Sequence, residues 1–128
     1  MNIMENKRPI QTFRDLQVYT LSHELAMKIF WLTTKFPAEE KYSLTDQVRR
    51  SSRSVAANIA EGWGKRRFEN TFKRHLVDSI GSLEETKCWL LFAFDCLYIS
   101  QESFNELTTD TEYLGAKLSK LHENWKTF

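Results

Sequence analysis

The side chains with the clearest chemical meaning in this sequence form one basic segment between residues 49 and 74. The segment carries six arginines and two lysines against two acids, so its net charge is +6, while the whole chain carries +1. Arginine binds phosphate through a planar guanidinium that donates two parallel hydrogen bonds. A local excess of this size predicts a surface for a polyanion such as RNA or DNA. The candidate phosphate-binding residues are Arg49, Arg50, Arg53, Lys65, Arg66, Arg67, Lys73 and Arg74.

A second interpretation of this basic segment is a solvated helix face followed by a charged hinge. Trp63 and Phe68 flank the hinge cations, and their rings are placed either to stack on unpaired bases or to cap the end of the core. Glu61 is expected to pair with a cation inside the fold, which would commit part of the basic excess to structure. Its candidate partners are Arg49, Arg50 and Lys87.

Residues with catalytic or metal-binding chemistry do not occur in useful combinations. Helical bundles that bind two metal ions use Glu-x-x-His pairs, but none of the three histidines has a glutamate three positions before it. The chain also has no Cys-x-x-Cys pair and no phosphate-binding glycine loop. Ser51, Ser52 and Ser54 lack a nearby histidine and are expected at a helix–helix contact. We therefore expect no enzyme, no metal site and no cofactor, and a bundle enzyme or metal carrier is disfavoured.

Length and composition indicate a single domain. The chain has 128 residues, of which 41% are hydrophobic, with two prolines and four glycines, and this argues against a loop-rich or all-β fold. A flexible arm is expected over residues 1–12 and the domain over 13–128. The N-terminal residues contain no apolar run, and no segment reaches the ~20 apolar residues of a membrane span. We expect a cytoplasmic protein with no membrane partner, in which Cys88 and Cys96 are buried, reduced thiols.

Hydrophobic periodicity predicts four helices with short connections. The predicted helices cover about 15–36, 44–62, 68–98 and 101–126. In the last of them, apolar residues recur at alternating steps of three and four from Phe104 to Trp125, the heptad pattern of near-parallel helix packing. Pro37 is expected to end the first helix, because the residue before a proline is pushed out of the helical region. The resulting fold is all-α, an antiparallel up-down-up-down four-helix bundle.

Serine and glycine residues mark the expected helix ends and contacts. The expected N-caps are Ser43 and Ser100. Gly62 and Gly64 are expected to supply left-handed backbone at the end of the second helix. Gly81 and Gly115 fall in the middle of helices, where glycine costs up to about 1 kcal/mol relative to alanine. We expect them to mark points where two helices approach closely.

The third predicted helix is apolar nearly all round between residues 88 and 99, with Asp95 as the exception. A surface helix of a monomer needs one buried face, so a second apolar face predicts cover by another subunit. Lys87 falls on the buried stripe of this helix and is expected to snorkel, to pair with an acid or to line a polar pocket. We therefore expect a homo-oligomer. Its interface residues would be Cys88, Trp89, Leu91, Phe92 and Cys96.

Several segments of the chain together resemble a known family. The most specific match is the stretch Ser54–Gly62, S-V-A-A-N-I-A-E-G. Further matching segments are Phe13–Leu16 with Val18-Tyr19, His23–Ala26, Leu44–Ser52, Gly81–Glu85 and Leu97–Ser100. They make the chain similar to the small bacterial four-helix proteins that are encoded in intervening sequences of 23S ribosomal RNA genes, also called S23 proteins.

The resemblance implies a four-helix bundle that assembles as a homopentamer, in a family where most members have no assigned activity. A related bundle is the accessory variability protein of diversity-generating retroelements, which partners a reverse transcriptase and is thought to contact RNA or DNA through a basic surface. At Lys87 this sequence departs from the family pattern, in which an acid is more frequent. Carried over to this chain, the contact residues would be Arg49, Arg50, Arg53, Lys65, Arg66 and Arg67.

Two hypotheses about function follow from these observations. The first is a non-enzymatic, cytoplasmic homo-oligomer that binds the phosphate backbone of structured RNA or DNA with little base selectivity. The alternative is a protein-interaction scaffold or adaptor, such as the accessory subunit of a reverse transcriptase in a diversity-generating retroelement. The two roles can coexist in one protein.

Overall fold

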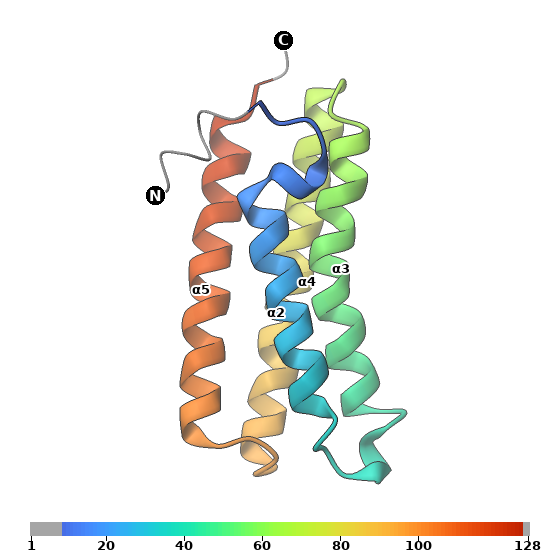
Figure 1. The fold of residues 1–128 in the computed structure, drawn as a ribbon, viewed down its shortest axis with the longest axis vertical. Helices are drawn as coiled ribbons and strands as arrows, with labels where there is room; N and C mark the ends of the chain where they lie inside the picture. The colour runs from blue at the N-terminus through green and yellow to red at the C-terminus, as the bar shows by residue number, and fades with distance from the viewer. Residues whose placement is uncertain (1–8, 127–128) are drawn as a thin grey trace.

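The chain folds into four long helices and two short 3-10 turns that stand side by side as a bundle (Figure 1). The computed structural model describes residues 9–126, and these residues contain no strand. Successive long helices run in opposite directions, which confirms the predicted antiparallel up-down-up-down bundle. The elements are η1 (Phe13–Asp15), α2 (Gln17–Thr33), η2 (Ala38–Glu40), α3 (Leu44–Gly64), α4 (Glu69–Asp95) and α5 (Gln101–Asn124).

The core is built from one inward stripe of each long helix. Ile29 of α2, Val55 of α3, Phe72 of α4 and Leu118 of α5 are completely buried. In the bundle, α3 packs against both α2 and α4, and α5 packs against α4 and α2. The buried residues of α5 are Leu107, Thr111, Leu114 and Leu118. They keep the predicted heptad spacing, so the periodicity of the sequence accounts for the observed core of this helix.

The first long helix ends earlier than the sequence suggests. α2 ends at Thr33, and the N–H groups of Lys35 and Phe36 bond to carbonyls three residues back. The Thr33 hydroxyl donates to the Ile29 carbonyl at 2.8 Å, a bond that competes with regular helix geometry. The tighter turn lets Phe36, which is 8% exposed, fold back into a small cluster at this end of the bundle. Pro37 lies beyond the last residue of α2, Thr33, so the proline does not determine where the helix ends.

One carboxylate organises the start of α3. Ser43 stands at the N-cap position, as predicted, but its side chain accepts no hydrogen bond from the helix. Instead, Glu40 Oε1 accepts the Leu44 N–H at 3.2 Å and the Ser43 hydroxyl, while Tyr98 donates its hydroxyl to Glu40 Oε2 at 2.8 Å. The Ser43 and Tyr98 hydroxyls hold the pKa of the Glu40 carboxyl below its ordinary value, and the bond to Glu40 raises the pKa of Tyr98 to about 12. Glu40 thus joins two loops at one end of the bundle.

The cap at the start of α5 is as predicted. Ser100 Oγ accepts the Ser103 N–H at 3.0 Å, which satisfies one of the orphan donors of the first turn. The preceding helix, α4, stops at Asp95 because Leu97 takes a left-handed conformation with φ at 66°. The Tyr98 N–H then bonds to the Ala93 carbonyl at 2.9 Å and the Leu97 N–H to the Phe94 carbonyl at 3.0 Å. This is a Schellman ending with leucine at the position that glycine usually takes.

Glycines play a different part from the one expected. The left-handed geometry predicted for Gly62 and Gly64 is wrong, because no glycine of the described residues has a positive φ and both lie inside α3. Gly62 is required for close packing, since a Cβ there would lie 2.7 Å from the Cβ of His75 on α4. The close contact predicted at Gly81 is also wrong, because nothing lies within 4 Å of a Cβ built there, whereas Gly115 would meet Leu83 at an ordinary 3.5 Å.

Candidate nucleic-acid interface

The basic segment occupies α3, the hinge after it and the start of α4. At 1.5 Å per residue, about 24 Å of helix separate Arg49 from Lys65. The eight cations therefore divide into one group in the first half of α3 and a second group at the opposite end of the bundle, where α3 meets α4 (Figure 1). A polyanion that contacts both groups would have to run along the length of α3.

Arg49 is the member of the first group with the most internal contacts. It is half-buried, and its Nε donates to Thr33 Oγ1 at 2.8 Å while its Nη2 donates to the Phe30 carbonyl at 3.3 Å. Its guanidinium also lies over the Phe30 ring, 4.6 Å from the centroid. Arg49 therefore holds the C-terminal end of α2 against α3, where a cation also meets the negative end of the helix dipole.

Arg50 and Arg53 are exposed, and neither makes an ion pair with any residue between 9 and 126. The Arg53 guanidinium lies over the Phe30 ring at a longer distance than that of Arg49, 5.9 Å from the ring centroid. These two side chains form the accessible part of the first basic group.

At the hinge, part of the positive charge is neutralised within the chain. Lys65 Nζ lies 2.9 Å from Glu61 Oε2 and 3.4 Å from His75 Nε2. The bond from Lys65 lowers the pKa of the Glu61 carboxyl below its ordinary value. The partners predicted for Glu61, which were Arg49, Arg50 and Lys87, are therefore wrong, because the cation four residues along the same helix lies closer.

Lys87 lies outside the core. The prediction that it falls on the buried stripe of α4 is wrong, because its neighbour Thr86 takes the buried position and a shift of one residue turns the side chain by about 100°. The lysine pairs with Glu84 at 2.7 Å, so the expected pairing with an acid is confirmed at an exposed site. Lys87 therefore neutralises no charged group in the core.

The two aromatic residues at the hinge have different roles. Trp63 is 7% exposed, packs edge-on against Phe72 and Trp125, and carries the Arg66 guanidinium 4.1 Å from its ring centroid. It caps the core, so its ring is covered. Phe68 is 61% exposed and has the Arg67 guanidinium 5.8 Å from its ring. Of the two expected stacking residues, Phe68 is the accessible one.

The first turns of α4 add the last two cations. Lys73 lies 3.7 Å from Glu69, a long ion pair between residues four positions apart. Arg74 is exposed and makes no ion pair with the described residues. Together with Arg50, Arg53 and Arg67, it completes a set of four exposed arginines without a carboxylate partner in the described part of the chain. These four residues are the exposed part of the basic segment whose charge no carboxylate of the described residues neutralises.

Behind the basic surface, small polar side chains join α3 to α4. Thr86 donates to Ser51 Oγ at 2.8 Å, and Ser54 and Ser82 share a hydrogen bond of 2.9 Å. This confirms that the serines of α3 lie at a helix–helix contact. Nearer the hinge, His75 Nδ1 lies 3.2 Å from Asn58 Oδ1. The polar contact could have been predicted from the sequence, because small polar residues recur at steps of three and four on both helices. The position of His75 was not predicted.

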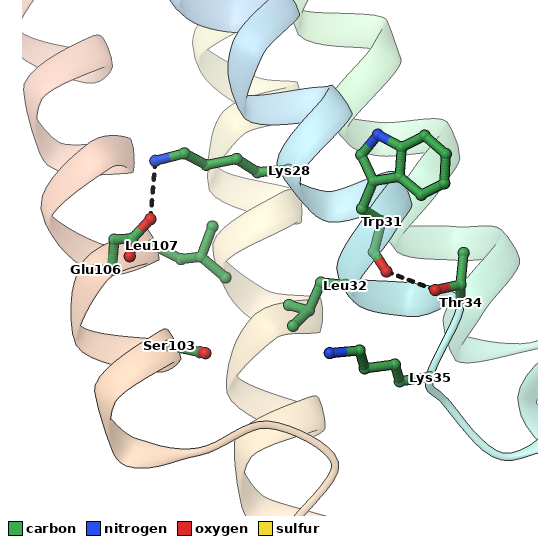
Figure 2. A pocket seen from close by; sticks show the side chains of 8 residues that line it. All are labelled: Lys28, Trp31, Leu32, Thr34, Lys35, Ser103, Glu106 and Leu107. Atoms are coloured by element: carbon green, nitrogen blue, oxygen red, sulfur yellow. Dashed lines mark hydrogen bonds and ion pairs between the residues drawn. The ribbon is translucent and has the colours of Figure 1, made fainter.

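The larger hollows beside α2 lie on its two flanks. A groove of about 300 Å³ lies between α2 and α3 and has Arg53 in its lining. A cavity of about 490 Å³ lies between α2 and α5, with Leu32 and Leu107 on its apolar side (Figure 2). In this cavity Lys28 binds both Glu106, at 2.9 Å, and Asp110, at 2.7 Å. These bonds raise the pKa of Lys28 to about 12. The two carboxylates balance the charge of Lys28, so this lysine adds no net positive charge to the cavity.

The described residues contain no cluster of three His, Cys, Asp or Glu side chains that could hold a metal ion. His23, His75 and His122 lie on α2, α4 and α5. Within residues 9–126, no helix combines the length and the apolar character that crossing a membrane requires.

The residues expected at an oligomer interface lie on α4 or, for Cys96, directly after it, and they are mostly exposed. Leu91 is 50% exposed and Phe92 is 53% exposed. Cys88 and Cys96 are exposed free thiols, so the prediction that they are buried is wrong for the single chain. Trp89 is partly buried and donates its indole N–H to Glu85 at 3.0 Å. Val77, at 51% exposure, extends the apolar surface toward the start of the helix.

These observations define a small all-α bundle with several exposed arginines and, among the described residues, no cluster that could hold a metal ion. The model of the 23S rRNA-intervening sequence protein family matches residues 14–120. The chain therefore belongs to this family, which confirms the resemblance seen in the sequence.

A solved structure supports the same assignment. It is the crystal structure of a protein of unknown function from the S23 ribosomal protein family of Bacteroides thetaiotaomicron, with a TM-score of 0.76 and 25% sequence identity. The similarity covers 84% of this chain and 96% of the other. No curated protein matches this chain. The family and the fold are thus assigned, and neither comparison indicates an enzyme family.

Proposed function

We propose that this chain is a non-enzymatic, cytoplasmic nucleic-acid-binding protein that contacts the phosphates of RNA or DNA and works as a homo-oligomer. The observation that carries the proposal is the set of four exposed arginines without carboxylate partners, Arg50, Arg53, Arg67 and Arg74. Such guanidinium groups bind phosphate oxygens in pairs and release condensed counterions when they do so. Contacts of this kind carry little sequence information, which fits low base selectivity.

The experiment compares binding of a labelled structured RNA and of duplex DNA to two variants with the same change in net charge. In the first variant, Arg50, Arg53, Arg67 and Arg74 are changed to Glu. In the matched control, Lys35, Lys41, Lys117 and Lys120 are changed to Glu. We expect the first variant to lose affinity on the order of a hundredfold or more at low salt, with a clearly smaller loss in the control. Equal losses would contradict a localised phosphate surface.

The oligomer in this proposal rests on the exposed side of α4. Val77, Cys88, Leu91 and Phe92 lie along it, and Gly81 leaves open space between them. An apolar surface of this kind is typical of a protein interface. The pentamer is the state that the family resemblance implies. Light scattering should show an oligomer at micromolar concentration, and F92E with L91E should shift it toward the monomer.

The same apolar surface favours a second candidate function, a scaffold or adaptor for another protein. The partner class that the resemblance implies is a reverse transcriptase, as in a diversity-generating retroelement. The two candidates separate by experiment: a scaffold would bind its partner enzyme with unchanged affinity after the four arginines are changed to Glu, and would lose it after F92E. A nucleic-acid-binding protein would respond to the arginine changes.

A further inference from the structure

The groove between α2 and α3 combines three kinds of side chain that seldom meet on a surface. Aromatic and ring side chains stand on the α2 side, alanines lie on the α3 side, and one arginine lies within its lining. No carboxylate belongs to the lining, in contrast to the α2–α5 cavity, which contains Glu106 (Figure 2). The lining residues are Phe13, Tyr19, His23, Ala26, Met27, Arg53, Ala56, Ala57 and Ala60.

The rings on one side of the groove are held in place by each other. Phe13 packs edge-on against Tyr19 with centroids 4.7 Å apart, and Tyr19 lies 5.7 Å from His23. The Tyr19 hydroxyl and His23 Nδ1 are 3.3 Å apart, within hydrogen-bond distance. Met27, which is 41% exposed, extends this wall with a polarisable thioether. The wall offers flat apolar surface together with polar atoms at its edge.

The opposite side of the groove is nearly flat because it consists of alanine methyl groups. Ala57 is exposed, and Ala56 is 8% exposed. Side chains this small let a planar group approach the α3 backbone closely. The volume of about 300 Å³ is at the lower end of the range for small-ligand sites, which suits one or two flat rings.

A cation stands at one end of this groove. Arg53 lies there, and Ala60 at the other end is one turn before Gly64, the last residue of α3 and the start of the hinge. From Arg53 to Gly64 the helix rises about 16 Å. A groove with rings and a guanidinium group in its lining matches the design of single-strand binding surfaces, in which bases stack and phosphates meet cations.

We infer that the α2–α3 groove receives an unpaired base of a single-stranded nucleic acid, while Arg53 and the hinge cations hold the flanking phosphates. The inference rests on the proposed nucleic-acid binding and adds to it a preference for single strands. Stacking in such a groove is tolerant of sequence, since every base has a flat face. The groove therefore distinguishes strands that have accessible bases from strands that do not.

The test uses an oligothymidylate of about ten nucleotides, within the ~4–16 that one single-strand groove covers, and an abasic phosphodiester chain of the same length and charge. We expect the native protein to bind the oligothymidylate at least about fivefold more tightly, the effect of stacking one base. Equal affinity for the two chains would overturn the base site and leave phosphate contact standing. Binding of neither chain at low salt would overturn the nucleic-acid function itself.

A pair of variants places the effect in the groove. Ala57→Leu fills the groove from an exposed helical position with a good helix former, and Ala116→Leu makes the same change at an exposed position of α5. We expect A57L to bind both chains equally and A116L to keep the native preference. If the preference survives in a folded A57L, the base lies elsewhere and the inference fails. The comparison of the oligothymidylate with the abasic chain uses the native protein, so it tests the inference even if A57L does not fold.

Discussion

The two sides of α4 differ in how their side chains are partnered. The side packed on α3 contains hydrogen-bonded Ser79, Ser82 and Thr86 among its apolar residues. The side turned to solvent carries Leu91 and Phe92, both about half exposed. The inner contact is thus fixed within one chain by specific hydrogen bonds. Exposed apolar side chains such as those on the outer side are typical of a surface that meets another protein.

The first prediction contrasts Gly62 of α3, which packs against the inner side of α4, with Gly81 on the exposed side of α4. Gly62→Ala places a Cβ 2.7 Å from the Cβ of His75 and 3.1 Å from the Phe72 ring, so we expect a loss of about 2–3 kcal/mol in the free energy of unfolding. Gly81→Ala meets nothing within 4 Å and should gain up to about 1 kcal/mol from helix propensity. Chemical denaturation of both variants measures the difference. Similar effects at the two positions would contradict the asymmetry of α4.

The second prediction contrasts two neighbouring arginines of α3, one packed and one exposed. Arg49→Ala removes bonds to Thr33 and to the Phe30 carbonyl, so we expect it to destabilise the chain by about 2 kcal/mol. Arg50→Ala should leave stability within about 0.5 kcal/mol and should weaken nucleic-acid binding. Thermal melting and a binding titration on both variants provide the readouts. A stability loss at Arg50 equal to that at Arg49 would show that both side chains are structural.

The third prediction concerns the residue that ends α4. Leu97 is 88% exposed and left-handed, a conformation that costs a side chain about 1–2 kcal/mol. Leu97→Gly should therefore raise the free energy of unfolding by about 1 kcal/mol, reduced by the greater freedom of glycine in the unfolded chain. Leu97→Ala is the control, because it trims the side chain and keeps the strain. A destabilised L97G would show that the leucine side chain makes a contact of its own.

The smallest effect is expected from pH. The pKa of the Glu40 carboxyl is lowered in the folded chain, so its contribution to stability is present above its ordinary pKa of 4.5 and is lost as pH falls through the folded value. Glu40→Gln should flatten the decline in melting temperature on acidification below about pH 5. Glu39→Gln, at a neighbouring carboxylate that accepts no hydrogen bond among the described residues, is the control. If the melting temperature of E40Q falls with pH as it does in the native protein, other groups cause the decline.

Much of this fold could be predicted because its signals are local. The spacing of Leu107, Leu114 and Leu118 follows from helix geometry alone, and Ser100 caps the helix that it directly precedes. Lys87 was misplaced because the predicted stripe followed the apolar Ile80, whereas the buried stripe of α4 passes through the small polar residues Ser79 and Thr86. A one-residue error in the stripe is enough to move a side chain from core to solvent.

The site could be predicted only in part, because charge in the sequence does not reveal its partner in space. Arg49 and Arg50 are identical in the sequence pattern, yet only Arg49 finds an acceptor, on a residue sixteen positions earlier. The Glu40–Tyr98 bond joins residues 58 positions apart. Such pairings depend on how the helices pack, so they became visible only with the fold. They divide the basic segment into cations used internally and cations presented to solvent.

The most direct test of the central claim is the salt dependence of duplex-DNA binding, compared between the native protein and a variant with Arg50, Arg53, Arg67 and Arg74 changed to Ala. Phosphate contact by these arginines predicts a linear fall of log affinity against log salt for the native protein. In the variant the slope should be shallower by about 0.9 for each phosphate contact removed. The same slope in both proteins, with the oligomer intact, would contradict the assignment of these arginines as the phosphate-binding surface.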